Sequence, residues 1–215
     1  VWGVTPEGRE MVALLLSDDG VFTEDAVRTA KRPVVFAQGG IHAGEIDGKD
    51  AGFQVAKELL AGKLAPGVLK VLTFVFVPVF NVDGHERMAK NNRPNQRGPE
   101  EMGWRVTSQN LNLNRDYTKA DALEMRGMLR LLKAYDPVLA MDLHVTDGAK
   151  FQHDVAILVD GVADLPPQRR TLARDLKHGR EHVARGLHAV RVRPPRVRLD
   201  EHPDAVVLRP IRLRE

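Results

Sequence analysis

Unbroken runs of apolar residues alternate along the chain with segments in which apolar residues recur every three or four positions. The runs cover residues 12–16, 33–37, 71–80, 138–143 and 155–159, and the run over residues 33–37 is rich in β-branched and aromatic residues. Such runs are typical of strands that are covered on both faces, whereas strands with one wet face alternate between apolar and polar residues. We therefore expect five buried strands.

The segments between these runs predict helices over residues 46–60, 121–134 and 168–188. In the first two, the apolar residues form one stripe at helical spacing; they are Ile46, Phe53, Ala56, Leu59 and Leu60, and Leu123, Met125, Met128, Leu129 and Leu132. Gly62 suits the end of the first helix. Strands that alternate with helices predict an α/β protein of three layers, α/β/α, with a mixed, mostly parallel central sheet.

Composition limits the chemistry that the chain can carry. The 215 residues include no cysteine, which excludes a disulfide scaffold, a cysteine nucleophile and a thiolate metal site. Any metal must therefore be held by His, Asp or Glu. With 43% hydrophobic and 28% charged residues the chain suits a globular fold. No apolar run approaches the roughly 20 residues of a membrane-spanning helix, so we expect no membrane span.

Positive charge is concentrated near the end of the chain. Residues 151–215 carry 13 Lys and Arg against 9 Asp and Glu, and seven of those Arg lie within residues 191–215. That segment has four prolines and no aromatic residue to stack on bases, so we expect no nucleic-acid partner. An alternative origin of this Arg/Pro-rich tail is a shifted reading frame.

Three potential metal ligands lie just after predicted strands. His42 and Glu45 follow the second strand in the segment Gly-Gly-Ile-His-Ala-Gly-Glu, and His144 ends the strand over residues 138–143. Ligands bind beyond the carboxyl ends of parallel strands. Two His and one Glu form an open zinc site that leaves a fourth position for water, although a solvated pair at a helix start remains the alternative for His42 and Glu45. By alternation along the strand, Asp142 faces the same side as His144 and is a candidate to orient it.

A second group of residues supplies positive charge. Asp83-Gly84 after the third strand predicts a turn, and Arg105 and Asn114-Arg115 follow in a loop-like stretch. A guanidinium binds a carboxylate through two hydrogen bonds and does not lose its charge, so Arg115 with the Asn114 amide suits a free carboxylate. Ordinary surface solvation is the alternative.

Taken together, these motifs resemble the zinc metallocarboxypeptidases, peptidase family M14. The motifs are Gly-Gly-Ile-His42-Ala-Gly-Glu45, Pro78-x-Phe-Asn81-x-Asp-Gly84, Trp104-Arg105, Leu-Asn114-Arg115-Asp116 and Asp142-Leu-His144, and the resemblance covers roughly residues 1–160. It implies one Zn²⁺ held by His42, Glu45 and His144.

The resemblance also implies the roles of the neighbouring residues. Asn114 and Arg115 would bind the terminal carboxylate of a peptide or another small substrate, and Arg105 would polarise the scissile carbonyl. A metal lowers the pKa of its bound water toward ~7, which is the nucleophile that peptide hydrolysis needs. Charge then developing on the carbonyl oxygen can be stabilised by the ion and Arg105.

The chain departs from the family pattern after His144. Family members carry a general-base Glu and a substrate-facing Tyr downstream; here the later Glu residues, Glu181, Glu201 and Glu215, stand in no such motif, and no Tyr follows Tyr135. We therefore expect a partial carboxypeptidase-like domain over residues 1–190 and a tail over residues 191–215.

This departure leaves three functions open. The first is a zinc carboxypeptidase, the second is a truncated or non-catalytic protein that binds zinc and carboxylates, and the third is a zinc deacylase of the same fold. The resemblance is compatible with a periplasmic or secreted protein, but the chain begins at Val1 without a leader, so the sequence fixes no compartment. It fixes no oligomeric state either.

Overall fold

The computed structural model describes residues 1–145. Within them, four of the five predicted strands and two of the three predicted helices are found. The strand predicted over residues 155–159, the helix predicted over residues 168–188 and the tail over residues 191–215 lie outside the described residues.

The centre of the structure is a mixed, four-stranded sheet. Its strands are β3 (Leu14–Leu16), β5 (Thr73–Val77), β4 (Val34–Gly39) and β6 (Leu139–Leu143), in the spatial order β3-β5-β4-β6. β3 runs antiparallel to β5, whereas β4 is parallel to both of its neighbours. The predicted mixed, mostly parallel sheet is confirmed.

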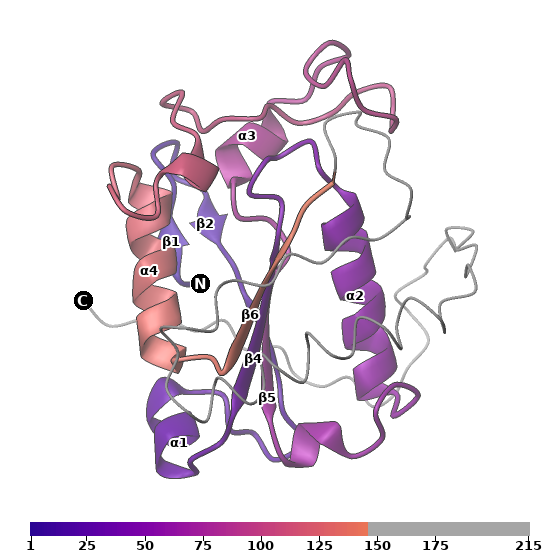
Figure 1. Cartoon of the computed structure of the whole chain (residues 1–215), viewed down its shortest axis with the longest axis vertical. Coiled ribbons are helices and arrows are strands. Elements are labelled where there is room, and N and C mark those ends of the chain that lie inside the picture. Colours follow the sequence, from indigo (N-terminus) through magenta and orange to yellow (C-terminus); the bar gives the residue numbers. More distant parts are fainter. Residues whose placement is uncertain (146–215) are drawn as a thin grey trace, which may run out of the picture. The chain divides into compact units, whose positions relative to one another are not determined.

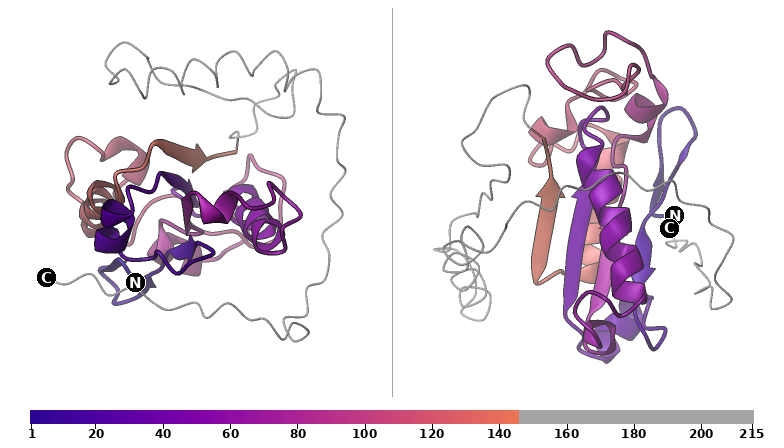
Figure 2. Two further views of the ribbon diagram at one scale, coloured as in Figure 1. Left: turned by 90° about the horizontal axis from the view of Figure 1, so that it is seen from below. Right: turned by 90° about the vertical axis from the view of Figure 1, so that its right-hand side faces the viewer.

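Helices cover both faces of this sheet. Helix α2 (Asp47–Leu60) lies on one face, and α1 (Glu24–Thr29) and α4 (Leu123–Tyr135) lie on the other (Figures 1 and 2). The strands therefore divide their apolar side chains between two cores, as the period of two along a strand requires. The α2 side buries Leu16, Ala37, Ala56, Leu69, Phe74 and Phe76, and the α4 side is built around Phe36, Val75, Val77, Phe80, Met125 and Met128.

Five short elements complete the described residues. A small antiparallel pair, β1 (Gly3–Val4) and β2 (Glu10–Met11), precedes the main sheet. The 3-10 helix η1 (Val68–Lys70) leads into β5, the short helix α3 (Val82–Glu86) follows β5, and the 3-10 helix η2 (Leu113–Arg115) precedes α4. Among residues 1–145, no helix has the length and apolar content to cross a membrane.

Three predictions about local structure were wrong. The turn expected at Asp83-Gly84 is the helix α3, because the Asn81 side chain caps it by accepting a hydrogen bond from the Gly84 N–H at 3.0 Å. The middle of β6 is exposed rather than buried, since β6 is the edge strand of the sheet formed by the described residues. Three members of the predicted helix stripes, Phe53, Leu60 and Leu123, are also exposed.

Candidate metal centre

His42 and His144 meet at one edge of the sheet because their strands are parallel neighbours. β4 pairs with β6 up to Gly39 and Leu143, so the segments that leave the two strands begin side by side. Gly40 turns the chain out of β4 in a left-handed conformation, with φ of 62°, which favours glycine. The next residues bring His42 and Glu45 back over this edge.

Ligand atoms from His42, Glu45 and His144 all lie within 4.8 Å of one another. The Nδ1 atom of His42 lies 2.9 Å from the Glu45 Oε1, and the two imidazole rings meet edge to face with centroids 5.1 Å apart. Zinc ligands about 2.0–2.2 Å from a tetrahedral ion lie about 3.4 Å from one another, so this donor set fits a single zinc ion. His42 and Glu45 are buried and His144 is exposed, which leaves the group open on one side.

The electrostatic environment favours a charged carboxylate at Glu45. Burial raises the pKa of Glu45, but the hydrogen bond between Glu45 and His42, the one that the Val145 N–H donates, and the nearby imidazoles outweigh burial and bring this pKa below the ordinary value. The hydrogen bond to Asp142 raises the pKa of His144 against the effect of burial. Glu45 is thus ionised, the form in which a carboxylate binds a metal.

Polar side chains hold both imidazoles in place. The Asp142 Oδ1 lies 3.3 Å from the His144 Nδ1, as the alternation along β6 predicts. The Asn112 Oδ1 lies 3.3 Å from the His42 Nε2, so Nδ1 is the nitrogen that faces Glu45. Such outer partners set the tautomer and orientation of metal-binding His. Asn112 was missed in the sequence, although its position two residues before Asn114 was a signal.

The residues expected to bind substrate surround this group to different extents. The Asn114 Nδ2 lies 3.1 Å from the His144 Nε2, and the Arg105 Nη1 lies 3.7 Å from the Glu45 Oε1. Arg115 is exposed, and its Nη1 donates to the Asn114 carbonyl oxygen at 2.8 Å. The structure therefore places Arg105 and Asn114 in contact with the group of three candidate ligands. Arg115 is exposed and contacts Asn114.

A second guanidinium, which no sequence motif predicted, contacts Glu45 directly. The Arg93 Nη2 donates to the Glu45 Oε1 at 2.8 Å, and both side chains are buried. Arg93 lies in the long segment between α3 and η2. A buried Arg is uncommon in proteins unless it is paired, but nothing in the composition of that segment distinguishes Arg93 from its exposed neighbours.

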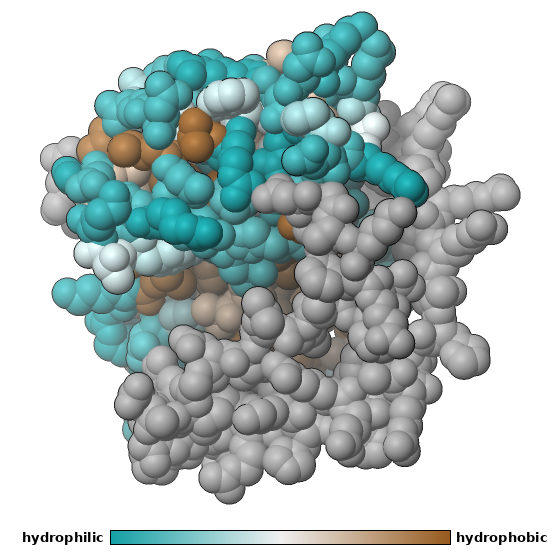
Figure 3. Space-filling model, turned by 45° about the horizontal axis from the view of Figure 1, so that its top comes forward, coloured by the Kyte–Doolittle hydropathy of each residue, from teal (hydrophilic) through white to brown (hydrophobic). Residues whose placement is uncertain are grey.

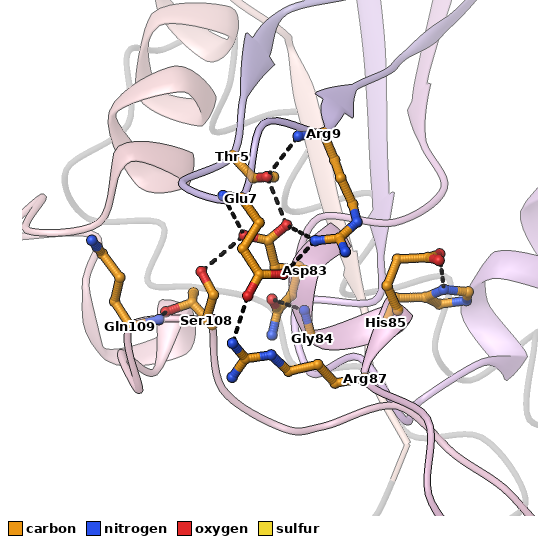
Figure 4. Close-up of polar contacts among 12 residues, drawn as sticks. Thr5, Glu7, Arg9, Asp83, Gly84, His85, Arg87, Ser108 and Gln109 are labelled. Atoms are coloured by element: carbon orange, nitrogen blue, oxygen red, sulfur yellow. Dashed lines mark hydrogen bonds and ion pairs between the residues drawn. The ribbon is translucent and has the colours of Figure 1, made fainter.

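The Asp83 carboxylate ties the segments around the site together (Figure 4). It accepts hydrogen bonds from the Thr5 hydroxyl at 2.6 Å, the Arg9 Nη1 at 2.7 Å, the Ser108 hydroxyl at 2.8 Å and the Glu7 N–H at 3.2 Å. Asp83 thereby fastens the β1–β2 pair and the loop before η2 to α3.

On the face turned forward in Figure 3, the described residues are largely hydrophilic, with a few apolar residues among them.

Comparison with known proteins decides the family. Residues 1–153 match the model of the zinc carboxypeptidase family, peptidase M14. The chain belongs to this family. All the sequence motifs that resemble those of M14 peptidases, from Gly39 to His144, lie within the matched residues.

Two solved metallocarboxypeptidases share the fold of this M14 chain. A metallocarboxypeptidase of Pseudomonas aeruginosa, solved with (2-guanidinoethylmercapto)succinic acid, is 19% identical with a TM-score of 0.62, over 91% of this chain and 46% of the other. A metallocarboxypeptidase of Burkholderia cenocepacia is 22% identical with a TM-score of 0.52, over 70% of this chain and 36% of the other. At these identities the likeness shows the fold.

A curated relative is similar in sequence over part of the chain. The inactive metallocarboxypeptidase ecm14 of Schizosaccharomyces pombe is 36% identical over 100 residues, which are 42% of this M14 chain and 19% of the relative. The chain therefore spans a small part of that relative and less than half of the two solved structures.

Proposed function

We propose that this M14 protein binds one zinc ion through His42, Glu45 and His144 and hydrolyses the C-terminal bond of peptides. The observation that carries the proposal is the convergence of these three side chains, from two parallel strands, on one point. Two neutral imidazoles and one carboxylate are a donor set that zinc prefers, and three protein ligands leave a position for water. Bound zinc lowers the pKa of that water and polarises a carbonyl.

The neighbouring residues of the chain perform the remaining tasks. Arg105, 3.7 Å from Glu45, lies where it can stabilise negative charge on the scissile carbonyl oxygen. Arg115, exposed beside Asn114, offers a guanidinium to the terminal carboxylate of the peptide. Asn112 and Asp142 keep the two imidazoles in one orientation, which preserves the open face of the site.

A second candidate function is binding of zinc and carboxylates without turnover. It is favoured by the likeness to a metallocarboxypeptidase described as inactive. Glu181, Glu201 and Glu215 all lie outside the described residues. The two functions share the metal and carboxylate sites and differ in catalysis.

A pair of peptides separates these functions. The zinc-loaded chain is incubated with a peptide that has a free C-terminus and with its C-terminally amidated twin, and product is measured by mass spectrometry. We expect cleavage of the free peptide only, because Arg115 selects a carboxylate; Arg115→Ala should raise KM about tenfold or more, whereas Arg130→Ala, on the exposed side of α4, should leave KM unchanged.

Each of the other results has one meaning. Binding of the free peptide without product would favour the non-catalytic function. Equal cleavage of the two peptides would contradict a carboxypeptidase, since the terminal carboxylate would then play no part in recognition.

A further inference from the structure

Arg93 is built into the site as a buried partner of Glu45. Its side chain is 4% exposed, and its Nη2 donates to the Glu45 Oε1 at 2.8 Å from a position 48 residues along the chain. The second guanidinium near this oxygen, that of Arg105, is 3.7 Å away and 33% exposed. Arg93 is therefore the closer and the better shielded of the two cations.

The backbone beneath Arg93 leaves room for its stem. A Cβ atom added to Gly44 would lie 2.4 Å from the Arg93 Cγ and 2.8 Å from its Cδ, so a larger residue at position 44 would displace the side chain. Gly44 lies between His42 and Glu45 in the sequence. The segment that supplies the proposed ligands thus also provides the cradle for the Arg93 stem.

Buried charges remain in proteins only where they are paired, because removal of water from an ion costs several kcal/mol. Arg93 and Glu45 satisfy this condition for each other, since the guanidinium donates to the carboxylate at 2.8 Å and both side chains are buried. The same oxygen also faces the His42 Nδ1 at 2.9 Å, on the side where the three ligand atoms converge. A metal held by this group would have the same carboxylate as a ligand that the Arg93 guanidinium contacts.

We propose that Arg93 is a positioning residue for Glu45, which neutralises and orients this carboxylate in the metal-free protein. The proposal rests on the proposed function for the identity of the metal. It has two consequences. First, Arg93 stabilises the arrangement of Glu45 before a metal is bound. Second, the positive charge of Arg93 repels a metal cation that approaches the same carboxylate, so Arg93 lowers the affinity of the site for zinc.

The first test is a double-mutant cycle on the metal-free chain. Thermal unfolding is followed in excess chelator for the 215-residue chain and for the variants Arg93→Met, Glu45→Gln and the double variant. We expect Arg93→Met to lower Tm in the original background and to have at most half of that effect beside Glu45→Gln, because the buried charge is then gone. Equal losses in both backgrounds would overturn the proposal, since Arg93 would then act by packing alone.

A conservative variant, Arg93→Lys, tests the proposal even if Arg93→Met does not fold. Arg93→Lys keeps the charge but has one compact donor group in place of the planar fork. It should therefore unfold at a Tm between those of the original chain and Arg93→Met. A Tm of Arg93→Lys no higher than that of Arg93→Met would count against a role of the charge.

The second test measures zinc affinity by competition with a chromophoric chelator. Arg93→Met should bind zinc at least threefold more tightly than the original chain, whereas Arg97→Met, an exposed Arg of the same segment, should bind it unchanged. Zinc binding by Arg93→Met that is unchanged or weaker would show that Arg93 does not oppose the metal, and would overturn this part of the proposal. An original chain that binds no zinc would overturn the proposed function, while the cycle in chelator still reports on the Arg93–Glu45 pair by itself.

Discussion

Two buried carboxyl groups, those of Asp83 and Glu124, have pKa values that are shifted in opposite directions. Burial raises the pKa of Asp83, but hydrogen bonds from Thr5, Arg9 and Ser108 outweigh burial and leave its pKa below the ordinary value. Glu124 in α4 is equally buried, and desolvation, with the nearby charge of Asp83, raises its pKa. Asp83 thus accepts several hydrogen bonds as a carboxylate, and it holds the β1–β2 turn and the loop before η2 to α3.

Replacement of Asp83 by Asn should destabilise the chain. Asp83→Asn removes the ion pair with Arg9 and presents an amide N–H₂ group to one of the donors that now point at the carboxylate. We expect a loss of about 3 kcal/mol in the free energy of unfolding at pH 7, measured with urea. The control is Asp121→Asn, an exposed carboxylate, which should change that free energy by less than about 0.5 kcal/mol.

The effect of Asp83 should also depend on pH in one direction. Its pKa is lowered in the folded state, so the stabilisation is present above the ordinary value of 3.8 and is lost as the pH falls through the folded-state pKa. The difference between the original chain and Asp83→Asn should therefore shrink below about pH 4. A difference that stays constant from pH 7 to pH 3 would show that the charge of Asp83 contributes nothing.

The sequence predicted the residues whose position follows from the ends of strands. His42, Glu45 and His144 come directly after apolar runs, and parallel pairing of those strands brings them together. Arg93 and Asn112 could not be found in this way, because both lie in the long segment between α3 and α4, which has no periodic pattern. Their contacts with Glu45 and His42 depend on how that segment folds back over the sheet.

At the scale of elements, α2 packs closely on the sheet through a glycine. A Cβ atom added to Gly52 would lie 2.0 Å from the Phe76 Cζ, and the Phe76 ring is fully buried. Gly52 thus lets the helix approach β5. The neighbouring Phe53 ring meets the Phe76 ring edge to face, with the two ring centroids 5.7 Å apart. The lack of a side chain at Gly52 thus allows the short distance between α2 and the sheet.

Gly52→Ala should therefore destabilise the chain, although Ala favours helix by about 1 kcal/mol over Gly. The added methyl group must displace a ring that has no free space, which costs about 1–3 kcal/mol beyond that gain. Urea unfolding measures the change, with Gln54→Ala on the exposed side of α2 as the control. A Gly52→Ala chain as stable as the control would contradict the close approach of α2 to Phe76.

Elements could be predicted where local pattern and burial agree. β4 and β5 were predicted because both faces of these strands are covered, and α2 and α4 because each has residues at helical spacing. The pair β1–β2 was missed because two residues per strand carry no periodic signal. α1 was missed because only Val27 of its six residues is buried.

At the scale of the whole molecule, the proposed site depends both on the sheet and on the segments that leave its edge. The pairing of two parallel strands determines where the segments that carry His42 and His144 leave the sheet, and helices cover both faces of that sheet (Figure 1). The M14 fold therefore explains why the candidate ligands, about 100 residues apart in the sequence, meet at one point. The central claim is that this point holds a metal.

Zinc content per chain tests this claim most directly. After incubation with zinc and removal of the excess, the 215-residue chain should retain one zinc by mass spectrometry of the metal, and His144→Ala should retain less than a tenth of that amount. His85→Ala, which removes an imidazole outside the ligand group, should retain one zinc. A full equivalent of zinc in His144→Ala, or no zinc in the original chain, would contradict the account.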